Sequence, residues 1–66
     1  MEIELNGKPY AITAGQTVQN LVATLFLEKT SFAVAVNQAV VPRSAWSERL
    51  LQARDQVEIV QAIGGG

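Results

Sequence analysis

The sequence predicts an α+β roll in which one main helix packs on one face of a mixed sheet of four to five strands. Three observations predict it. Apolar residues alternate at the start of the 66-residue chain and again in its second half, the spacing in between becomes helical, and Asn6-Gly7 supplies an early hairpin turn. With 48% hydrophobic residues, 17% charged residues and a net charge of −1, the chain has the composition of one globular domain.

The first expected element is a β-hairpin. Residues 1–5 alternate between polar and apolar, Asn6 and Gly7 suit the positive-φ positions of a type I′ turn, and residues 8–12 resume the strand. Because Pro9 has no N–H to give to a ladder, the second strand should lie at the edge of the sheet. The first strand is then free to pair on its other side.

An amphipathic helix of about three turns is expected next, because apolar residues recur at positions i, i+3, i+4 and i+7. Thr17 is the expected N-cap, although Asn20 stands where a full capping box would have Glu or Gln. The apolar positions of this helix are Val18, Leu21, Val22 and Leu25.

Three more strands should complete the sheet. Residues 32–36 alternate large and small side chains, which suits a strand whose bulky side faces the helix. A tight turn at Asn37-Gln38 leads into a short strand at 39–41, and a weak helical turn is expected over residues 44–51, presenting Trp46 and Leu50.

The last strand is expected at residues 57–62, parallel to the first strand at the centre of the sheet. This β-β-α-β-β-β order with one helix on one sheet face describes a β-grasp roll. We expect residues 1–62 to form the β-grasp domain and residues 63–66 to form a flexible C-terminal tail.

Composition argues against several functions. The chain has no histidine and no cysteine, so catalysis by this chain alone, a disulfide and a thiolate metal site are not expected. The five basic residues are scattered, so a nucleic-acid partner is not expected either. The acidic residues Glu2, Glu4 and Glu58 fall on one strand face, which indicates a solvated surface rather than a metal site.

The ends of the chain carry two further expectations. The start, Met-Glu-Ile-Glu, lacks the pattern of a signal peptide, and no apolar run reaches the length of a membrane span, so the protein is expected to be cytoplasmic with no membrane partner. At the other end, Gly64-Gly65-Gly66 could lie extended in a slot too narrow for side chains, where a partner could handle the terminal carboxylate. A frayed end or a cloning remnant is the alternative.

These features occur together with several short motifs in a fixed order. They are Asn6-Gly7, Gly15-Gln16-Thr17-Val18 with Leu21, Val36-Asn37, Val41-Pro42-Arg43, Trp46, Asp55 with Val57-Glu58-Ile59-Val60, and Ala62-Ile63-Gly64-Gly65-Gly66. With them the chain resembles, over essentially its whole length, the sulfur-carrier proteins of thiamine biosynthesis, a bacterial ubiquitin-like family. Many members have Gly where this chain has Arg54, so the conformation of that turn is a point of departure.

The resemblance implies a carrier that is not itself an enzyme and that binds no cofactor. An adenylating enzyme of the ubiquitin-activating type, using ATP and Mg²⁺, would activate the carboxylate of Gly66. A desulfurase system would supply sulfur to make a thiocarboxylate, and a thiazole synthase would draw on it. The free chain is expected to be a monomer.

Strand parity predicts where such partners dock. Val60 and Ala62 fall on the face opposite Val57, so with Ile63 they could form an apolar patch beside the tail residues Gly64 and Gly65. The alternative is that the loop around Trp46 covers Val60. Trp46 itself is expected to be a core residue rather than a ligand platform.

Three rival functions share this fold. The small subunit of molybdopterin synthase also ends in Gly-Gly, a ubiquitin-like protein tag would use the same activated carboxylate, and a non-covalent β-grasp binding module would not need the tail. The short chain and its Ala-Ile-Gly-Gly-Gly ending favour the thiamine branch.

Overall fold

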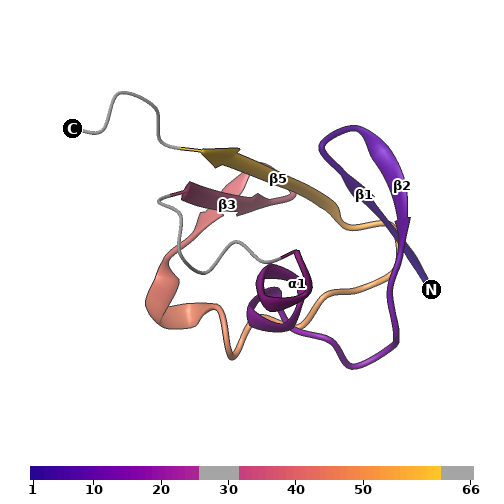
Figure 1. Cartoon of the computed structure of the whole chain (residues 1–66), viewed down its shortest axis with the longest axis horizontal. Coiled ribbons are helices and arrows are strands. Elements are labelled where there is room, and N and C mark those ends of the chain that lie inside the picture. Colours follow the sequence, from indigo (N-terminus) through magenta and orange to yellow (C-terminus); the bar gives the residue numbers. More distant parts are fainter. Residues whose placement is uncertain (26–31, 62–66) are drawn as a thin grey trace.

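A mixed sheet of five strands with one α-helix on one face is formed by the residues that the computed structural model describes, 1–25 and 32–61 (Figure 1). The elements in chain order are β1 (Glu2–Leu5), β2 (Lys8–Ala11), α1 (Val18–Thr24), β3 (Phe32–Val36), β4 (Ala39–Val41), the 3₁₀ helix η1 (Arg43–Ala45) and β5 (Gln56–Gln61). The predicted element order and the β-grasp roll are therefore confirmed.

The hairpin of β1 and β2 forms as predicted. Asn6 and Gly7 have φ angles of 50° and 83°, and Ile3 pairs with Tyr10 across the ladder. The sheet order β2-β1-β5-β3-β4 places β2 at an edge, as the missing N–H of Pro9 requires.

The last strand, β5, lies at the centre of the sheet. It runs parallel to β1, with Leu5 opposite Val57, and antiparallel to β3. It begins one residue earlier than predicted, because the backbone of Gln56 is bonded at both groups: its N–H donates to Asn37 Oδ1 at 2.9 Å and its carbonyl accepts from the Asn37 N–H at 2.7 Å.

Helix α1 presents Val18, Leu21 and Val22 to the core, as the period of the sequence predicts. A complete capping box starts it, because Thr17 Oγ1 accepts from the Asn20 N–H at 3.2 Å and Asn20 Oδ1 accepts from the Thr17 N–H at 2.9 Å. The expectation that Asn20 would leave the box incomplete was wrong. Its amide is shorter than that of Gln but carries the same kind of acceptor.

The helix is shorter than predicted. Its seven residues make about two turns rather than three. The Thr24 hydroxyl donates to the Asn20 carbonyl at 2.9 Å, a local bond that competes with helical bonding, and the backbone leaves helical geometry at Leu25.

The segment between β4 and β5 lies on the helix side of the sheet (Figure 1). The predicted helical turn over 44–51 was wrong in its bounds, since only η1 is helical there. The cause is that the carbonyls of Trp46 and Arg49 accept from the N–H groups of Gln19 and Val18, at 3.1 and 3.0 Å. These bonds satisfy donors that the first turn of a helix leaves unpaired.

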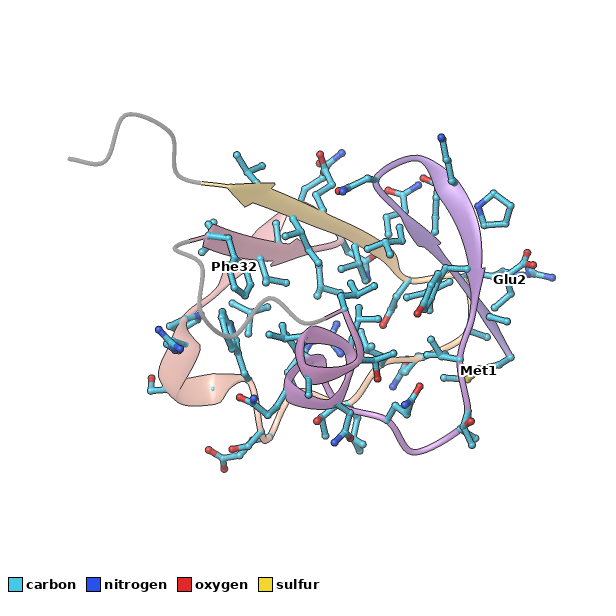
Figure 2. The ribbon with its side chains drawn as sticks, in the orientation of Figure 1. Met1, Glu2 and Phe32 are labelled. Carbon is cyan, nitrogen blue, oxygen red and sulfur yellow. The ribbon has the colours of Figure 1, made fainter. Side chains whose placement is uncertain are left out.

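Trp46 belongs to the core, as predicted, with 3% of its surface exposed. Its ring stacks on Phe32 at a centroid distance of 5.2 Å, and its indole N–H donates to the Val41 carbonyl at 2.9 Å. Phe32 lies between β3 and this segment (Figure 2). Leu50, which was expected to be presented beside Trp46, is instead 52% exposed. The other buried core residues are Ile3, Ile12, Val18, Leu21, Val22, Val34, Val36, Leu51 and Val57.

Candidate functional site

The candidate site is the surface from which the chain end leaves the sheet. β5 runs to Gln61, and the predicted tail follows it in the sequence. Of the predicted site residues, Val60 lies within the described part of the chain. The others lie outside the described residues: Ala62, Ile63, Gly64, Gly65 and Gly66.

Val60 is exposed on the sheet face that carries no helix. Its side chain is 65% exposed, whereas Val57 on the opposite face is 1% exposed. The predicted alternation along β5 is therefore confirmed. The alternative in which the loop around Trp46 covers Val60 is wrong, because Trp46 packs into the core on the helix side.

The helix-free face is hollowed next to Val60, and the sequence analysis did not identify this feature. Ala33 on β3 lies opposite Val60, and Ala35 lies opposite both Glu58 and Val40. Two small residues between larger neighbours leave a hollow of about 300 Å³. We name it the β3 hollow, and it is lined by Ala33, Val34, Ala35, Gln38, Val40, Glu58 and Val60. The large–small alternation of residues 32–36 was the signal, but it was used only for the buried side.

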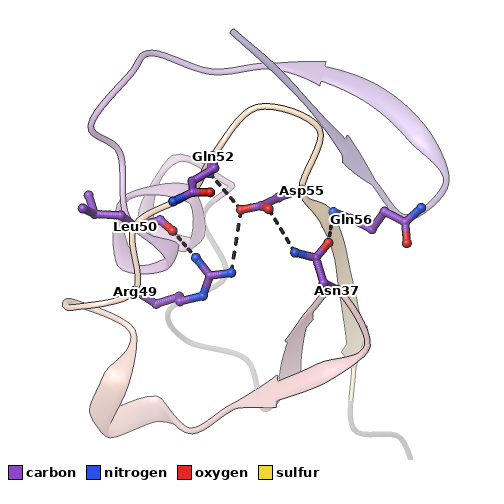
Figure 3. Close-up of polar contacts among 6 residues, drawn as sticks. All are labelled: Asn37, Arg49, Leu50, Gln52, Asp55 and Gln56. Atoms are coloured by element: carbon purple, nitrogen blue, oxygen red, sulfur yellow. Dashed lines mark hydrogen bonds and ion pairs between the residues drawn. The ribbon is translucent and has the colours of Figure 1, made fainter.

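A polar network fixes the turns at the other end of these strands (Figure 3). Asp55, 7% exposed, accepts from Asn37 Nδ2 at 3.0 Å and from the Gln52 N–H at 2.8 Å. Arg49 Nη2 lies 3.8 Å from the same carboxylate. Together with the bonds between Asn37 and Gln56, this network ties the β3–β4 turn to the start of β5, and so holds the strands under the hollow in register.

The turn at Arg54 adopts the conformation that glycine favours. Its φ is 70°, in the left-handed region, and its N–H donates to the Glu2 carbonyl at 2.8 Å. The departure from glycine at this position therefore leaves the turn intact and places some backbone strain in it.

The described residues offer little for catalysis. Within residues 1–25 and 32–61, no group of three or more His, Cys, Asp or Glu residues is placed to hold a metal ion. Glu2, Glu4 and Glu58 are exposed on the sheet, as the parity of the strands predicts. No helix in this same part of the chain is long and apolar enough to cross a membrane.

These observations define a class: a small β-grasp protein with an exposed apolar surface on its last strand and a glycine-rich segment beyond it. The chain belongs to the ThiS family, whose model matches residues 3–66. This membership places it among small sulfur carriers rather than among enzymes.

Individual relatives agree with this assignment. The sulfur carrier protein ThiS of Escherichia coli (strain K12) is 38% identical over 66 residues, and the match covers 100% of both chains. The crystal structure of the thiamine biosynthesis protein ThiS from Geobacter metallireducens superposes with a TM-score of 0.83 at 28% identity, with 100% of both chains covered. A thiazole synthase of Magnetococcus marinus is 42% identical over 66 residues, and the chain spans 20% of its length.

Proposed function

We propose that this protein carries sulfur for thiazole formation in thiamine biosynthesis, as a thiocarboxylate on Gly66. The single observation that supports it most is the end-to-end match to the E. coli sulfur carrier, which covers 100% of both chains and so aligns the two glycine-rich ends. The described residues hold no site for catalysis of their own. The chain end is therefore the group on which chemistry would act.

The chemistry follows from the nature of a carboxylate. A free carboxylate is a poor electrophile, so a carboxylate oxygen of Gly66 would first attack the α-phosphate of ATP and release pyrophosphate. The acyl-adenylate that forms has AMP as its leaving group. Attack by the terminal sulfur of a persulfide expels AMP, and a thiol then releases the thiocarboxylate from the resulting acyl disulfide.

The chain itself would contribute reach and placement. Glycines have no Cβ, so residues 64–66 can enter an active site that excludes water and side chains. β5, held between β1 and β3, anchors the start of this segment on a rigid element. ATP and Mg²⁺ would be bound by the adenylating enzyme rather than by this chain.

The proposed partners are an adenylating enzyme of the ubiquitin-activating type, a desulfurase system and a thiazole synthase. The last has direct support: the chain matches 20% of the length of each of two proteins named thiazole synthase, from M. marinus and Paramagnetospirillum magneticum. In these proteins a domain similar to this one belongs to the same polypeptide as the remaining 80%. Such linkage raises the effective concentration of two modules that work together.

The proposal is tested by incubating the protein with ATP, Mg²⁺, a persulfide source, a thiol and a candidate adenylating enzyme, followed by intact-mass measurement. We expect an AMP adduct without the sulfur source, and replacement of one oxygen by sulfur with it. Deleting Gly66, or replacing Gly65→Trp, should abolish both products and leave the melting temperature of the domain unchanged, since glycines bring no side chains to a core. Full sulfur transfer to the chain that lacks Gly66 would contradict the proposal.

A further inference from the structure

The β3 hollow exposes apolar side chains that the core does not use. Val40 is 71% exposed and Val60 is 65% exposed, and they stand on either side of the floor formed by Ala33 and Ala35. Among the described residues, these are two of the four large hydrophobic side chains that are exposed. Half of that exposed apolar surface is thus gathered at one concave place, which is typical of a surface that a partner covers.

Gln38 is held at the rim of the hollow in a strained conformation. It is the second central residue of the β3–β4 turn, with a φ of 71°, where a two-residue hairpin turn of this kind favours glycine. The turn would form with less strain if this residue were glycine. A strained side chain that lines a concave surface indicates a role outside the fold.

The position of the hollow identifies its occupant. Val60 precedes by one residue the last described residue of β5, after which the chain continues to the segment that the proposed function places in the adenylating enzyme. An enzyme that encloses residues 64–66 must approach along β5, and the helix-free face is the exposed apolar surface there. The charge of this face is acidic, because Glu58 lines the hollow and Glu2 and Glu4 lie on the same face of β1.

We propose that the β3 hollow accepts an apolar side chain of the adenylating enzyme and that Gln38 is a specificity-determining residue at its rim. The inference rests on the proposed function, because it takes the adenylating enzyme as the partner. The small floor residues admit the apolar side chain. The Gln38 amide, which both donates and accepts, pairs with a polar group beside that side chain, and Glu58 faces a basic residue of the enzyme.

The first test fills the hollow. Ala33→Ile adds volume at an exposed strand position that favours β-branched residues, so the domain should fold with an unchanged melting temperature. Affinity for the adenylating enzyme, measured by calorimetry, should fall by about tenfold or more, whereas saturating enzyme should still adenylate Gly66. The control is Ala11→Ile, the same change at an exposed position of β2 outside the hollow, which should leave the affinity unchanged. Unchanged or tighter binding by Ala33→Ile overturns the proposal.

The second test separates binding from strain. Gln38 and Arg54 have nearly the same φ, 71° and 70°, but only Gln38 lines the β3 hollow. Gln38→Gly and Arg54→Gly should therefore both raise the melting temperature of the free domain by a few degrees. Only Gln38→Gly should lose affinity for the enzyme, by several-fold. A purely structural role for Gln38 predicts higher stability with unchanged affinity, and that result overturns its assignment.

The outcomes distinguish this inference from the function on which it rests. If the wild-type chain is adenylated and Ala33→Ile binds as well as wild type, the hollow is not the docking surface but the carrier function stands. If Ala33→Ile loses affinity only for the thiazole synthase, the occupant is the synthase and the assignment to the adenylating enzyme is overturned. If the wild-type chain neither binds nor is adenylated, both proposals fail.

Discussion

At the scale of single residues, Asp55 shows how one carboxylate can organise two loops. It accepts hydrogen bonds from the side chain of Asn37, 18 residues earlier, and from the backbone of Gln52 in its own turn. The sequence marks Asp55 only as part of a motif before a strand. Its bond to Asn37 could not be inferred from spacing, because it exists only once β3 and β5 have paired.

We expect Asp55→Ala to lower the free energy of unfolding by about 2 kcal/mol, since the amide of Asn37 and the N–H of Gln52 would lose their acceptor in a largely buried place. Urea denaturation followed by fluorescence of Trp46 measures the change. The control is Glu48→Ala, which removes an exposed acid and should stay within about 0.5 kcal/mol of wild type. Equal losses in the two variants would contradict a structural role for Asp55.

At the scale of elements, α1 depends on a segment that lies far along the chain. Its first turn is closed by its own capping box and also by carbonyls of the segment between η1 and β5. A helix of seven residues is too short to be stable in isolation, so packing against the sheet must supply most of its stability. The apolar face of the helix provides that packing.

Leu21→Ala should therefore destabilise the domain strongly, by about 2–5 kcal/mol, because a fully buried side chain at the helix–sheet interface would be replaced by a cavity. Gln19→Ala, on the same helix and outside the core cluster, should cost little. Equilibrium denaturation compares the two. If both variants were equally mild, α1 would not be packed as described.

At the scale of the whole molecule, β5 separates two surfaces with different tasks. One face of it completes the core beneath α1, and the other presents Val60 toward solvent beside the β3 hollow. The fold can therefore be held by one face while a partner binds the other. Substitutions on the two faces of this one strand should have separable effects.

We expect Val60→Asp to weaken binding to the adenylating enzyme about tenfold or more, with the melting temperature of the free domain unchanged, because it charges an exposed surface that binding must desolvate. Val57→Asp, three residues earlier on the buried face, should instead unfold the domain. Leu50→Asp, at another exposed apolar residue, should leave both properties unchanged. Calorimetry and thermal melting distinguish these results, and a joint loss of affinity and stability in Val60→Asp would show that Val60 supports the fold.

The sequence by itself determined the features that obey local rules. The turn at Asn6-Gly7, the buried face of α1 and the alternation along β5 follow from backbone sterics and from the periods of helix and strand, which act over a few residues. The pairing of β5 with β1 also followed, because few topologies satisfy a helix crossover and an edge strand marked by Pro9.

Tertiary structure alone decided the features that depend on residues distant in sequence. The segment after η1 gives its carbonyls to the start of α1 instead of forming a longer helix, and β5 begins at Gln56 because Asn37 bonds it there. The β3 hollow likewise exists only because Ala33 and Ala35 are placed between Val60 and Val40 by strand register. The physical reason is the same in each case: backbone groups and small side chains take their role from whichever partner the fold brings to them, and no local period encodes that partner.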